Sequence, residues 1–293
     1  MRRVTVELVD AFIDDGAGGN VAGVVFEGAA ELSTAQRQEI ARQAAVSETA
    51  FVLPSDTADY GLEFYTPTRR IPHCGHATVG TFARLAETGR LKGKEVVNET
   101  VDGPRRIRIQ DERAFLEQVP ARLTRLDDST TRQVLASLGI NKEQLLPDGG
   151  PFLADNGNRS IQIGLADTGV LRSIRPDMDR VSDITNRLDA VCYYAFSLTS
   201  VMPGRDATAR MFGPAYGIPE ESATGMAAGP LACWLDAKTD ARRSGFSIEQ
   251  GHLMSPASAS LIIAQPERSG RTLSAMWVGG GAKMRELRRF SIA

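Results

Sequence analysis

The sequence predicts an α+β protein made of two similar domains, each a sheet curled around one central helix. Short apolar runs of β type fill much of the chain. Two helical segments, 75–89 and 224–237, are apolar on every side, which is typical of a helix that is buried on every side. The halves also repeat one pattern, because FYTP-x3-IP at 64–72 matches MFGP-x3-IP at 211–219.

The first half contains most of its expected elements in a strand-rich order. Val4, Val6 and Leu8 alternate with polar residues, as in a half-buried strand. The Gly-rich turn at 14–20 does not indicate a dinucleotide loop, because the glycines of that motif open a helix and here an apolar β-type run follows. A capping box from Ser33 to Gln36 starts a helix that reaches about residue 46. Further strands are expected at 22–27, 47–54, 60–66, 94–101, 105–110 and 114–119.

The central helix of the first half is expected to end at Gly89, as its C′ residue. After a polar stretch at 119–130 and a helix at 131–139, the strand-rich pattern resumes. Strands are expected at 159–167, 169–174, 190–199, 208–213, 245–249, 258–264 and 272–278. The predicted domains are residues 1–124 together with 283–293, and residues 125–282.

Composition excludes several classes of function. The 293 residues carry 34 basic and 36 acidic side chains, a net charge of −2, so we expect no nucleic-acid partner. No apolar run approaches the length that spans a membrane, and no signal peptide is visible, so a cytoplasmic protein is expected. An odd number of cysteines without CxxC spacing argues against a disulfide framework.

Rare residues crowd into HCGHATVG at 73–80. Zinc needs three or four ligands, and the third histidine, His252, is distant in sequence, while Cys74 and His76 are expected to point in different directions. We therefore expect no metal. Cys74 could act as a base, since a helix N-terminus lowers a thiol pKa.

Three motifs together carry a family resemblance. They are SETAFV at 47–52, CGHAT at 74–78, and Phe212-x-Pro-x-x-Gly-Ile-x-Glu-x-x-Ala-Thr-Gly at 212–225, with Gly19-Asn20 as a further match. In this order and spacing the chain resembles the PhzF-like isomerases of phenazine biosynthesis, within the diaminopimelate-epimerase-like group. The resemblance covers nearly the whole chain.

The resemblance implies a fold and a reaction. The fold is a pseudo-symmetric pair of barrel-like α+β domains, with residues 283–293 returning to the first domain and a cleft between the two helix starts. The implied activity is that of a cofactor-independent isomerase that moves a proton on a small unsaturated or amino/hydroxy carboxylic acid, and the implied assembly is a homodimer. The implied catalytic residues are Glu48, His76 and Glu221, and the implied substrate contacts are Ser47, Gly75, Thr224, Gly225 and Met226.

The chemistry of the residues is compatible with this implication. A carboxylate that moves a proton on carbon needs a pKa raised towards neutrality, which burial supplies, and Glu48 lies in an apolar β-type stretch where it either faces water or is enclosed. In and just after the third motif, the chain departs from the family at three positions: Glu221 stands where the family usually has an aspartate, Ser222 where it often has a proline, and Met226 where it commonly has a serine. Two alternatives therefore stay open. One is a dehydratase or epimerase that uses Cys74, although Thr224 stands where the resemblance to the two-thiol epimerases would imply a second cysteine. The other is a non-catalytic protein that binds a small acid.

Overall fold

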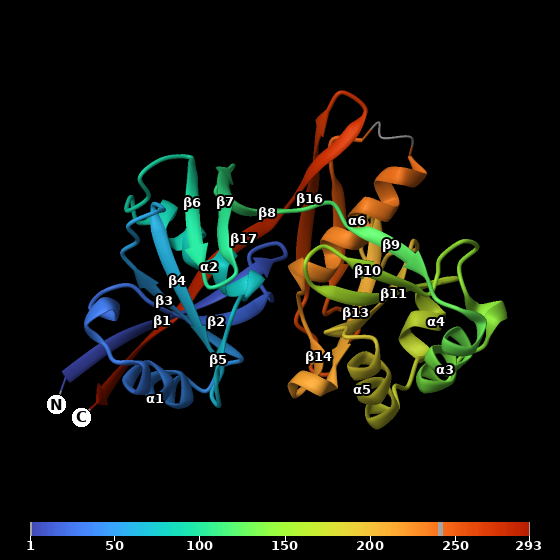
Figure 1. Ribbon diagram of the computed structural model, residues 1–293, viewed down its shortest axis with the longest axis horizontal. Helices are drawn as coiled ribbons and strands as arrows, with labels where there is room; N and C mark the ends of the chain where they lie inside the picture. The colour runs from blue at the N-terminus through green and yellow to red at the C-terminus, as the bar shows by residue number, and fades with distance from the viewer. Residues whose placement is uncertain (1, 240–242, 293) are drawn as a thin grey trace. The chain divides into compact units, whose positions relative to one another are not determined.

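The computed structural model describes residues 2–239 and 243–292, which fold as two compact units (Figure 1). Unit 1 comprises residues 1–117 and 279–293, and unit 2 comprises residues 118–278. Both units mix sheet and helix, with strands in the majority, as the predicted fold class requires. No helix within the described ranges is both long and apolar enough to cross a membrane.

Unit 1 follows the expected order of elements closely. Its strands are β1 (Arg2–Ile13), β2 (Asn20–Val25), β3 (Glu48–Leu53), β4 (Tyr60–Tyr65), β5 (Arg70–Ile71), β6 (Glu95–Thr100), β7 (Gly103–Gln110), β8 (Arg113–Gln118) and the end of β17 (Thr272–Ile292). Its helices are α1 (Thr34–Ala44) and α2 (Gly75–Glu87), with a 3₁₀ turn at Ala29–Glu31.

The two helices of unit 1 begin and end where their sequences predict. Ser33 caps α1, since its hydroxyl accepts from Gln36 N at 3.2 Å while the Gln36 side chain accepts from Ser33 N at 3.0 Å. At the end of α2, Gly89 has φ +66° and donates to Ala86 O. A left-handed residue at C′ is the usual way to stop a helix, so the expected glycine stop is confirmed.

Helix α2 is the buried helix of unit 1. It packs against β1, β2, β3 and β7, and nine of its residues are buried, including His76, Val79 and Phe82. Gly80 permits the close approach to β1, because a Cβ there would lie 3.3 Å from Val9 Cγ1. Helix α1 packs instead on the opposite face of β3 and β4, where Phe51, Tyr65 and Ile40 share one apolar cluster.

Unit 2 contains the remaining elements. Its strands are β9 (Arg122–Arg125), β10 (Phe152–Asp155), β11 (Arg159–Leu165), β12 (Cys192–Ser197), β13 (Ala207–Gly213), β14 (Ile218–Glu221), β15 (Phe246–Gln250), β16 (Ser260–Ser269) and the first part of β17. Its helices are α3 (Asp128–Leu138), α4 (Thr168–Ser173), α5 (Met178–Arg187) and α6 (Gly225–Lys238), with 3₁₀ turns at Lys142–Gln144 and Pro214–Tyr216.

One expected strand of unit 2 is wrong. Residues 169–174 lie mainly in helix α4, because the Asp167 carboxylate caps the helix by accepting from Val170 N at 2.8 Å. Its buried Leu171 and the following Ile174 are three residues apart, a helical rather than a β spacing. Helix α5 has no counterpart among the expected elements, although Asp177 caps it and Val181 and Ile184 give it a buried stripe.

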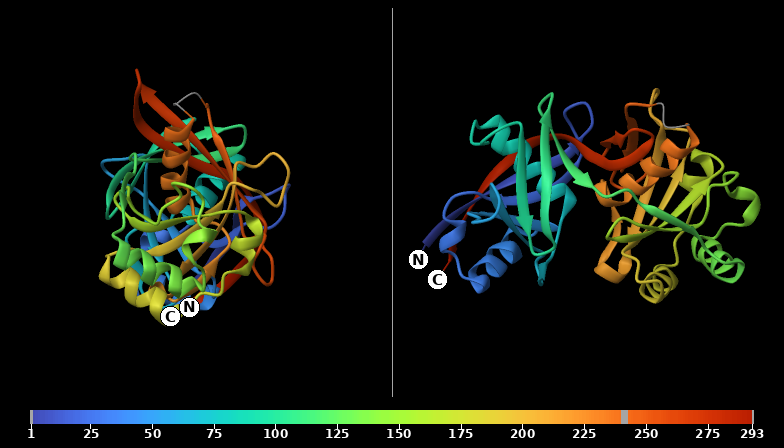
Figure 2. Two further views of the ribbon diagram at one scale, coloured as in Figure 1. Left: turned by 90° about the vertical axis from the view of Figure 1, so that its right-hand side faces the viewer. Right: turned by 45° about the horizontal axis from the view of Figure 1, so that its top comes forward.

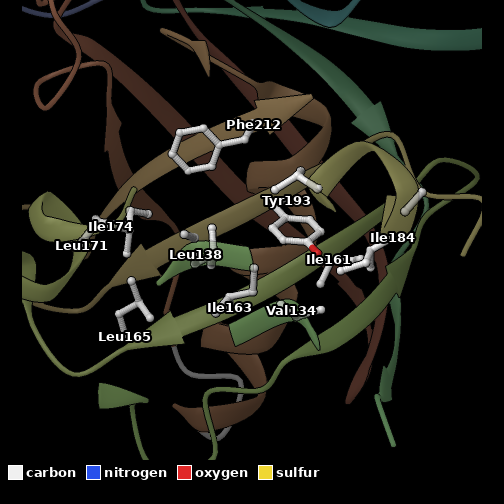
Figure 3. Close-up of a cluster of buried hydrophobic side chains, with 13 residues drawn as sticks. Val134, Leu138, Ile161, Ile163, Leu165, Leu171, Ile174, Ile184, Tyr193 and Phe212 are labelled. Atoms are coloured by element: carbon white, nitrogen blue, oxygen red, sulfur yellow. The ribbon is translucent and has the colours of Figure 1, made fainter. Parts of the chain in front are cut away.

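Helices α3, α4 and α5 cover one face of β11, β12 and β13. Figure 3 shows the side chains that meet there, among them Ile161 and Ile163 from β11, Tyr193 from β12 and Phe212 from β13. The opposite face of β12 carries Phe196, whose ring lies 5.5 Å from that of Trp234 on α6. Strand β12 is therefore buried on both faces, which explains its continuous apolar sequence.

The two units repeat one strand topology. In unit 1, β2 pairs with β1 in antiparallel and with β3 in parallel orientation, and in unit 2, β11 pairs in the same way with β10 and β12. Likewise β4 is antiparallel to β3 and β5 and parallel to β6, and β13 has the same relations to β12, β14 and β15. The internal duplication inferred from two short motifs therefore extends across the sheets.

Registers give the corresponding residues. When Pro67 is matched to Pro214, Tyr65 corresponds to Phe212, and their partners Thr49 and Tyr193 correspond on the preceding strands. Continuing in this register, Glu48 corresponds to Cys192, and their partners on β2 and β11 are Ala22 and Ser160. The Gly19-Asn20 turn then corresponds to Gly157-Asn158, and both glycines have positive φ.

The last strand joins the ends of unit 1. Strand β17 pairs with β1 in antiparallel register from Arg2 with Ile292 to Ile13 with Gly281. Figure 2 shows the result, with the red end of the chain beside the blue beginning. Unit 1 is therefore completed by residues that follow the whole of unit 2 in the sequence.

Candidate active site

Glu48 is an enclosed carboxylate, one of the two alternatives that its sequence context left open. It opens β3, pairs with Ala22 on β2, and is 6% exposed. Neighbouring Phe51 points to the α1 side of the sheet, while Glu48 faces the start of α2. The alternation of a strand thus gives one face to the core and turns the acid towards a helix N-terminus.

His76 is the direct partner of Glu48. It is the second residue of α2 and 4% exposed, and its Nε2 lies 3.2 Å from Glu48 Oε2. The contact has the length of an ion pair, yet Oε2 accepts no well-directed hydrogen bond from a residue in the described ranges. This carboxylate oxygen is thus held near a cation while its lone pairs stay open to a proton from elsewhere.

Asn20 and Ser47 complete the surroundings of the imidazole. Asn20 Nδ2 lies 3.2 Å from His76 Nδ1, and Ser47 Oγ lies 3.5 Å from Nε2. Because an amide offers both a donor and an acceptor, Asn20 can face either a neutral or a protonated ring by turning over. The site residues expected from the sequence omit Asn20, although it belongs to the Gly19-Asn20 match noted there.

The pKa values of the pair move in opposite directions. Burial raises the pKa of Glu48, but its polar neighbours outweigh this, first among them His76 through its close contact and its charge, and hold the pKa below the ordinary value of 4.5. Burial lowers the pKa of His76, but Cys74 and Glu48 outweigh this and hold it well above 6.5. The resting pair is therefore carboxylate and imidazolium, and the expected upward shift of the Glu48 pKa is wrong, because its neighbour is a cation.

Cys74 lies with this pair, contrary to the expectation that it points away from His76. Its Sγ is 3.5 Å from His76 Nδ1, and burial raises the pKa of the thiol. Glu48, Cys74 and His76 offer three ligand atoms within 4.8 Å of one another, and all three are buried. Counting histidines in the sequence did not foresee this set, because the glutamate comes from another strand. The same three groups could hold a proton or a metal ion.

The expected residues of unit 2 form a second polar group. Thr224 directly precedes the first residue of α6, and its hydroxyl donates to the Glu221 carboxylate and not to the helix backbone. Gln250, fully buried on β15, donates to Glu221 O at 2.7 Å and to Thr224 Oγ1 at 3.0 Å. It also accepts from Thr224 N at 3.1 Å and from the Tyr194 hydroxyl at 3.0 Å. Gln250 and Tyr194 therefore fix this helix start, and no sequence motif singled them out.

Gly225 and Met226 present backbone groups. Gly225 O accepts from Gln118 Nε2 at 3.0 Å, and Met226 O accepts from Asn156 Nδ2 at 3.2 Å. Gly75, at the corresponding start of α2, is partly exposed. At both starts the first backbone N–H groups have no partner within their own helix, as the geometry of any helix requires.

Comparison of the repeats separates the two groups chemically. The positions of Glu48 and His76 are occupied in unit 2 by Cys192 and Met226, and only the asparagine of the Gly-Asn turn recurs. Burial raises the pKa of Cys192 to a value at which it stays a thiol. A carboxylate beside an imidazolium, able to accept and to donate a proton, is thus found at this position in unit 1 and not at its counterpart.

Comparison with known proteins gives consistent findings. A family model described as "Phenazine biosynthesis-like protein", PhzC-PhzF, matches residues 9–285. An uncharacterized isomerase of Escherichia coli strain K12 is 35% identical over 78% of this chain and 77% of its own length. A trans-2,3-dihydro-3-hydroxyanthranilate isomerase of Pseudomonas aeruginosa is 31% identical over 97% of this chain and 98% of its own.

A solved structure shows the same fold. The Bacillus anthracis phenazine biosynthesis protein of the PhzF family superposes with a TM-score of 0.87, covers all of both chains and is 22% identical. This similarity confirms the fold class predicted from the sequence, including the sheet-dominated α+β architecture.

Proposed function

The chain belongs to the phenazine biosynthesis-like PhzC-PhzF family and is an isomerase, and from this premise we propose that it moves a proton between carbons of a small unsaturated carboxylic acid without a cofactor. Glu48 is the proposed base. His76 is the proposed acid, and Glu221 is proposed to assist. Ser47, Gly75, Thr224, Gly225 and Met226 remain proposed substrate contacts.

One observation carries this proposal: the buried contact of 3.2 Å between Glu48 Oε2 and His76 Nε2. The pKa of Glu48 is lowered and the pKa of His76 is raised, so both groups are held in their ionised forms. An ionised carboxylate is the form that accepts a proton, and an imidazolium is the form that donates one. Burial strengthens both effects, because few waters compete for either group.

The proposed step conserves atoms and charge. Glu48 takes a proton from a carbon next to the unsaturated system, and the electron pair of the C–H bond spreads into that system towards the carboxyl group. A proton then returns to a different carbon, from Glu48 or from His76, and the electron pair forms the new C–H bond. The imidazolium stabilises the anion formed between these two events.

The first substrate to test is trans-2,3-dihydro-3-hydroxyanthranilate, because the relative named for that reaction covers nearly the whole chain. The reaction is run in D₂O and followed by NMR for new isomer and for deuterium at carbon. We expect Glu48→Gln to lower kcat by about a hundred- to ten-thousand-fold, the range that a positioned acid or base supplies. His76→Gln should also lower kcat, and Glu221→Gln tests the unit 2 group separately.

Cys74→Ser is the matched control within the same cluster. Burial keeps this side chain a thiol, so we expect the variant to retain most of its kcat. Removing metal with a chelator should leave wild-type turnover unchanged. Full activity of a folded Glu48→Gln protein would refute the role of Glu48. Loss of activity on both Cys74→Ser substitution and chelation would instead favour a metal held by Glu48, Cys74 and His76.

A non-catalytic role is the second candidate, and the departures at Glu221, Ser222 and Met226 favour it. Such a protein would bind the acid and cause no exchange of carbon-bound hydrogen. Deuterium at carbon after incubation with wild-type protein, and not with Glu48→Gln, would exclude this candidate.

A further inference from the structure

Three polar side chains of unit 1, two on strands and one just before α2, have buried atoms that make no hydrogen bond to a described residue. Asn98 on β6 is 0% exposed, and neither its Nδ2 nor its Oδ1 makes a hydrogen bond to a described residue. His73 Nδ1 and Arg105 Nε are also buried without a hydrogen-bond partner in that part of the chain. We name His73, Asn98 and Arg105 the polar cluster.

The strand registers bring these side chains to one face. Asn98 pairs with Arg105 on β7, so the two side chains point to the same side of the sheet. Asn98 also pairs with Tyr60 on β4, whose ring lies 5.5 Å from that of Phe82 on α2. The shared side is therefore the one that faces α2.

His73 joins the cluster from the chain just before α2. Its ring stacks edge-on against Phe64 of β4 at 5.9 Å. Burial and, after it, the charge of Arg105 lower the pKa of His73 to about 4, so the ring is neutral at pH 7 and lies close enough to feel the guanidinium. His73 and Arg105 are each only partly buried, whereas Asn98 is fully buried.

The second repeat provides an internal control for this cluster. The residue before the helix cap is His73 in unit 1 and Ala223 in unit 2. Asn98 and Arg105 correspond to Ile248 and Ile262, which pair with each other as their counterparts do. All three unit 2 residues are 0% exposed. The fold thus builds the same place from apolar side chains, and polar ones are not needed to form it.

A buried amide and a buried guanidinium Nε–H without partners are destabilising, so the polar cluster needs a role that offsets this cost. The donors available are a guanidinium, an amide N–H₂ and one N–H of a neutral ring, a set that suits a carboxylate. We propose that His73, Asn98 and Arg105 form a binding site for the carboxylate group of a small acid. That this acid is the substrate rests on the proposed function; the binding itself does not.

Binding can be tested with acetate as the probe and acetamide as its uncharged control, at constant ionic strength. We expect acetate, and not acetamide, to raise the Tm of the wild-type protein in a saturable way and to shift the His73 ring signal in NMR spectra. Only three histidines give such signals, and a His73→Ala spectrum assigns this one.

The decisive variant carries the unit 2 residues: His73→Ala, Asn98→Ile and Arg105→Ile. We expect it to be more stable than wild type, because apolar side chains replace unpaired polar ones, and to lose the response to acetate. If it fails to fold, Arg105→Gln replaces it, with an expected loss of acetate affinity of about tenfold or more. Neither variant removes Glu48 or His76, so a failure here leaves the proposed chemistry intact.

An unchanged acetate response in a folded variant would overturn the proposal. So would a wild-type protein that responds equally to acetate and acetamide, or a crystal structure grown with acetate in which only ordered waters meet the polar cluster. With an identified substrate, the proposal further requires that Arg105→Gln raise KM more than it lowers kcat.

Discussion

At the scale of the residue, the central feature is a charged pair buried in unit 1. Glu48 alone in this position would be pushed towards its neutral form by burial, and His76 alone would be pushed the same way. Together they hold each other in the charged forms. The pair is therefore both the proposed machinery of proton transfer and a source of pH-dependent stability.

The pH dependence of stability has a definite sign. The pKa of His76 is raised above 6.5, so its contribution to the free energy of unfolding is complete below pH 6.5 and is lost as the pH rises through the folded-state pKa. The pKa of Glu48 is lowered below 4.5, so its contribution is present above pH 4.5 and is lost as the pH falls through the lowered pKa. We therefore expect the difference in the free energy of unfolding between wild type and His76→Gln to be largest between pH 4.5 and pH 6.5.

Urea unfolding of both proteins across this pH range measures the difference. Glu48→Gln supplies the control, because it removes one of the two groups that raise the pKa of His76, so the pH dependence should weaken in that background. A stability difference between wild type and His76→Gln that stays constant from pH 6.5 into the alkaline range would contradict the raised pKa.

At the scale of the element, side chains from neighbouring strands and loops supply hydrogen bonds that the backbone of α6 lacks. Pro230 lies within α6 and has no backbone N–H, so Met226 O lacks its partner four residues ahead. Asn156 Nδ2 donates to that carbonyl at 3.2 Å and to Gln118 Oε1 at 2.9 Å. Gln162 Nε2 donates to the next carbonyl, Ala227 O, at 3.1 Å. Side-chain amides thus satisfy the first turn, which also contains Gly225 and Met226 of the proposed site.

A double-mutant cycle tests this repair. Asn156→Leu leaves the Met226 carbonyl buried without its donor, and we expect a loss of about 1–3 kcal/mol in the free energy of unfolding. Pro230→Ala supplies the missing N–H, so in that background the same substitution should lose about 1 kcal/mol less. Denaturant unfolding of the four proteins gives the coupling. Strict additivity would show that Asn156 does not act through the proline.

At the scale of the molecule, the duplicated topology has an unusual closing strand. Unit 1 begins with β1 and is completed only by the end of β17, while β9, which follows β8, pairs with β10 in unit 2. Strand β9 thus directly follows the strands of unit 1 but belongs to unit 2, and the end of β17 follows the strands of unit 2 but belongs to unit 1. Unit 1 therefore depends on a segment that lies outside its own continuous stretch of sequence, whereas unit 2 is one continuous stretch.

Truncation after residue 281 tests this dependence. It removes the pairs with β1 from Arg2–Ile292 to Ala11–Ala282 and exposes the edge of β1, so we expect unit 1 to unfold or aggregate. Circular dichroism and size-exclusion chromatography measure the result. The matched control is Leu287→Ser, which changes a side chain that is 51% exposed and leaves the strand in place. A truncated protein as stable as the control would show that unit 1 does not need β17.

The sequence by itself determined what depends on neighbours along the chain. The capping box at Ser33, the stop at Gly89 and the apolar helices that begin at Gly75 and Gly225 follow from local hydrogen bonding and helical spacing. The duplication was visible because both copies kept the same turn chemistry. The prediction of a strand at 169–174 was wrong, because a short apolar run has no clear period and the capping hydrogen bond of Asp167 stabilises a helix there.

Only the tertiary structure decided which residues meet. Glu48 and His76 are separated by twenty-eight positions in the sequence. Because β3 pairs in parallel with β2 and both strands pack against α2, Glu48 Oε2 comes to 3.2 Å from His76 Nε2. The same packing brings Asn20 and Cys74 to the imidazole. That meeting reversed the expected direction of the Glu48 pKa, because a pKa depends on the charges nearby in space. The polar cluster was equally invisible in the sequence, since strand register alone sets Asn98 beside Arg105.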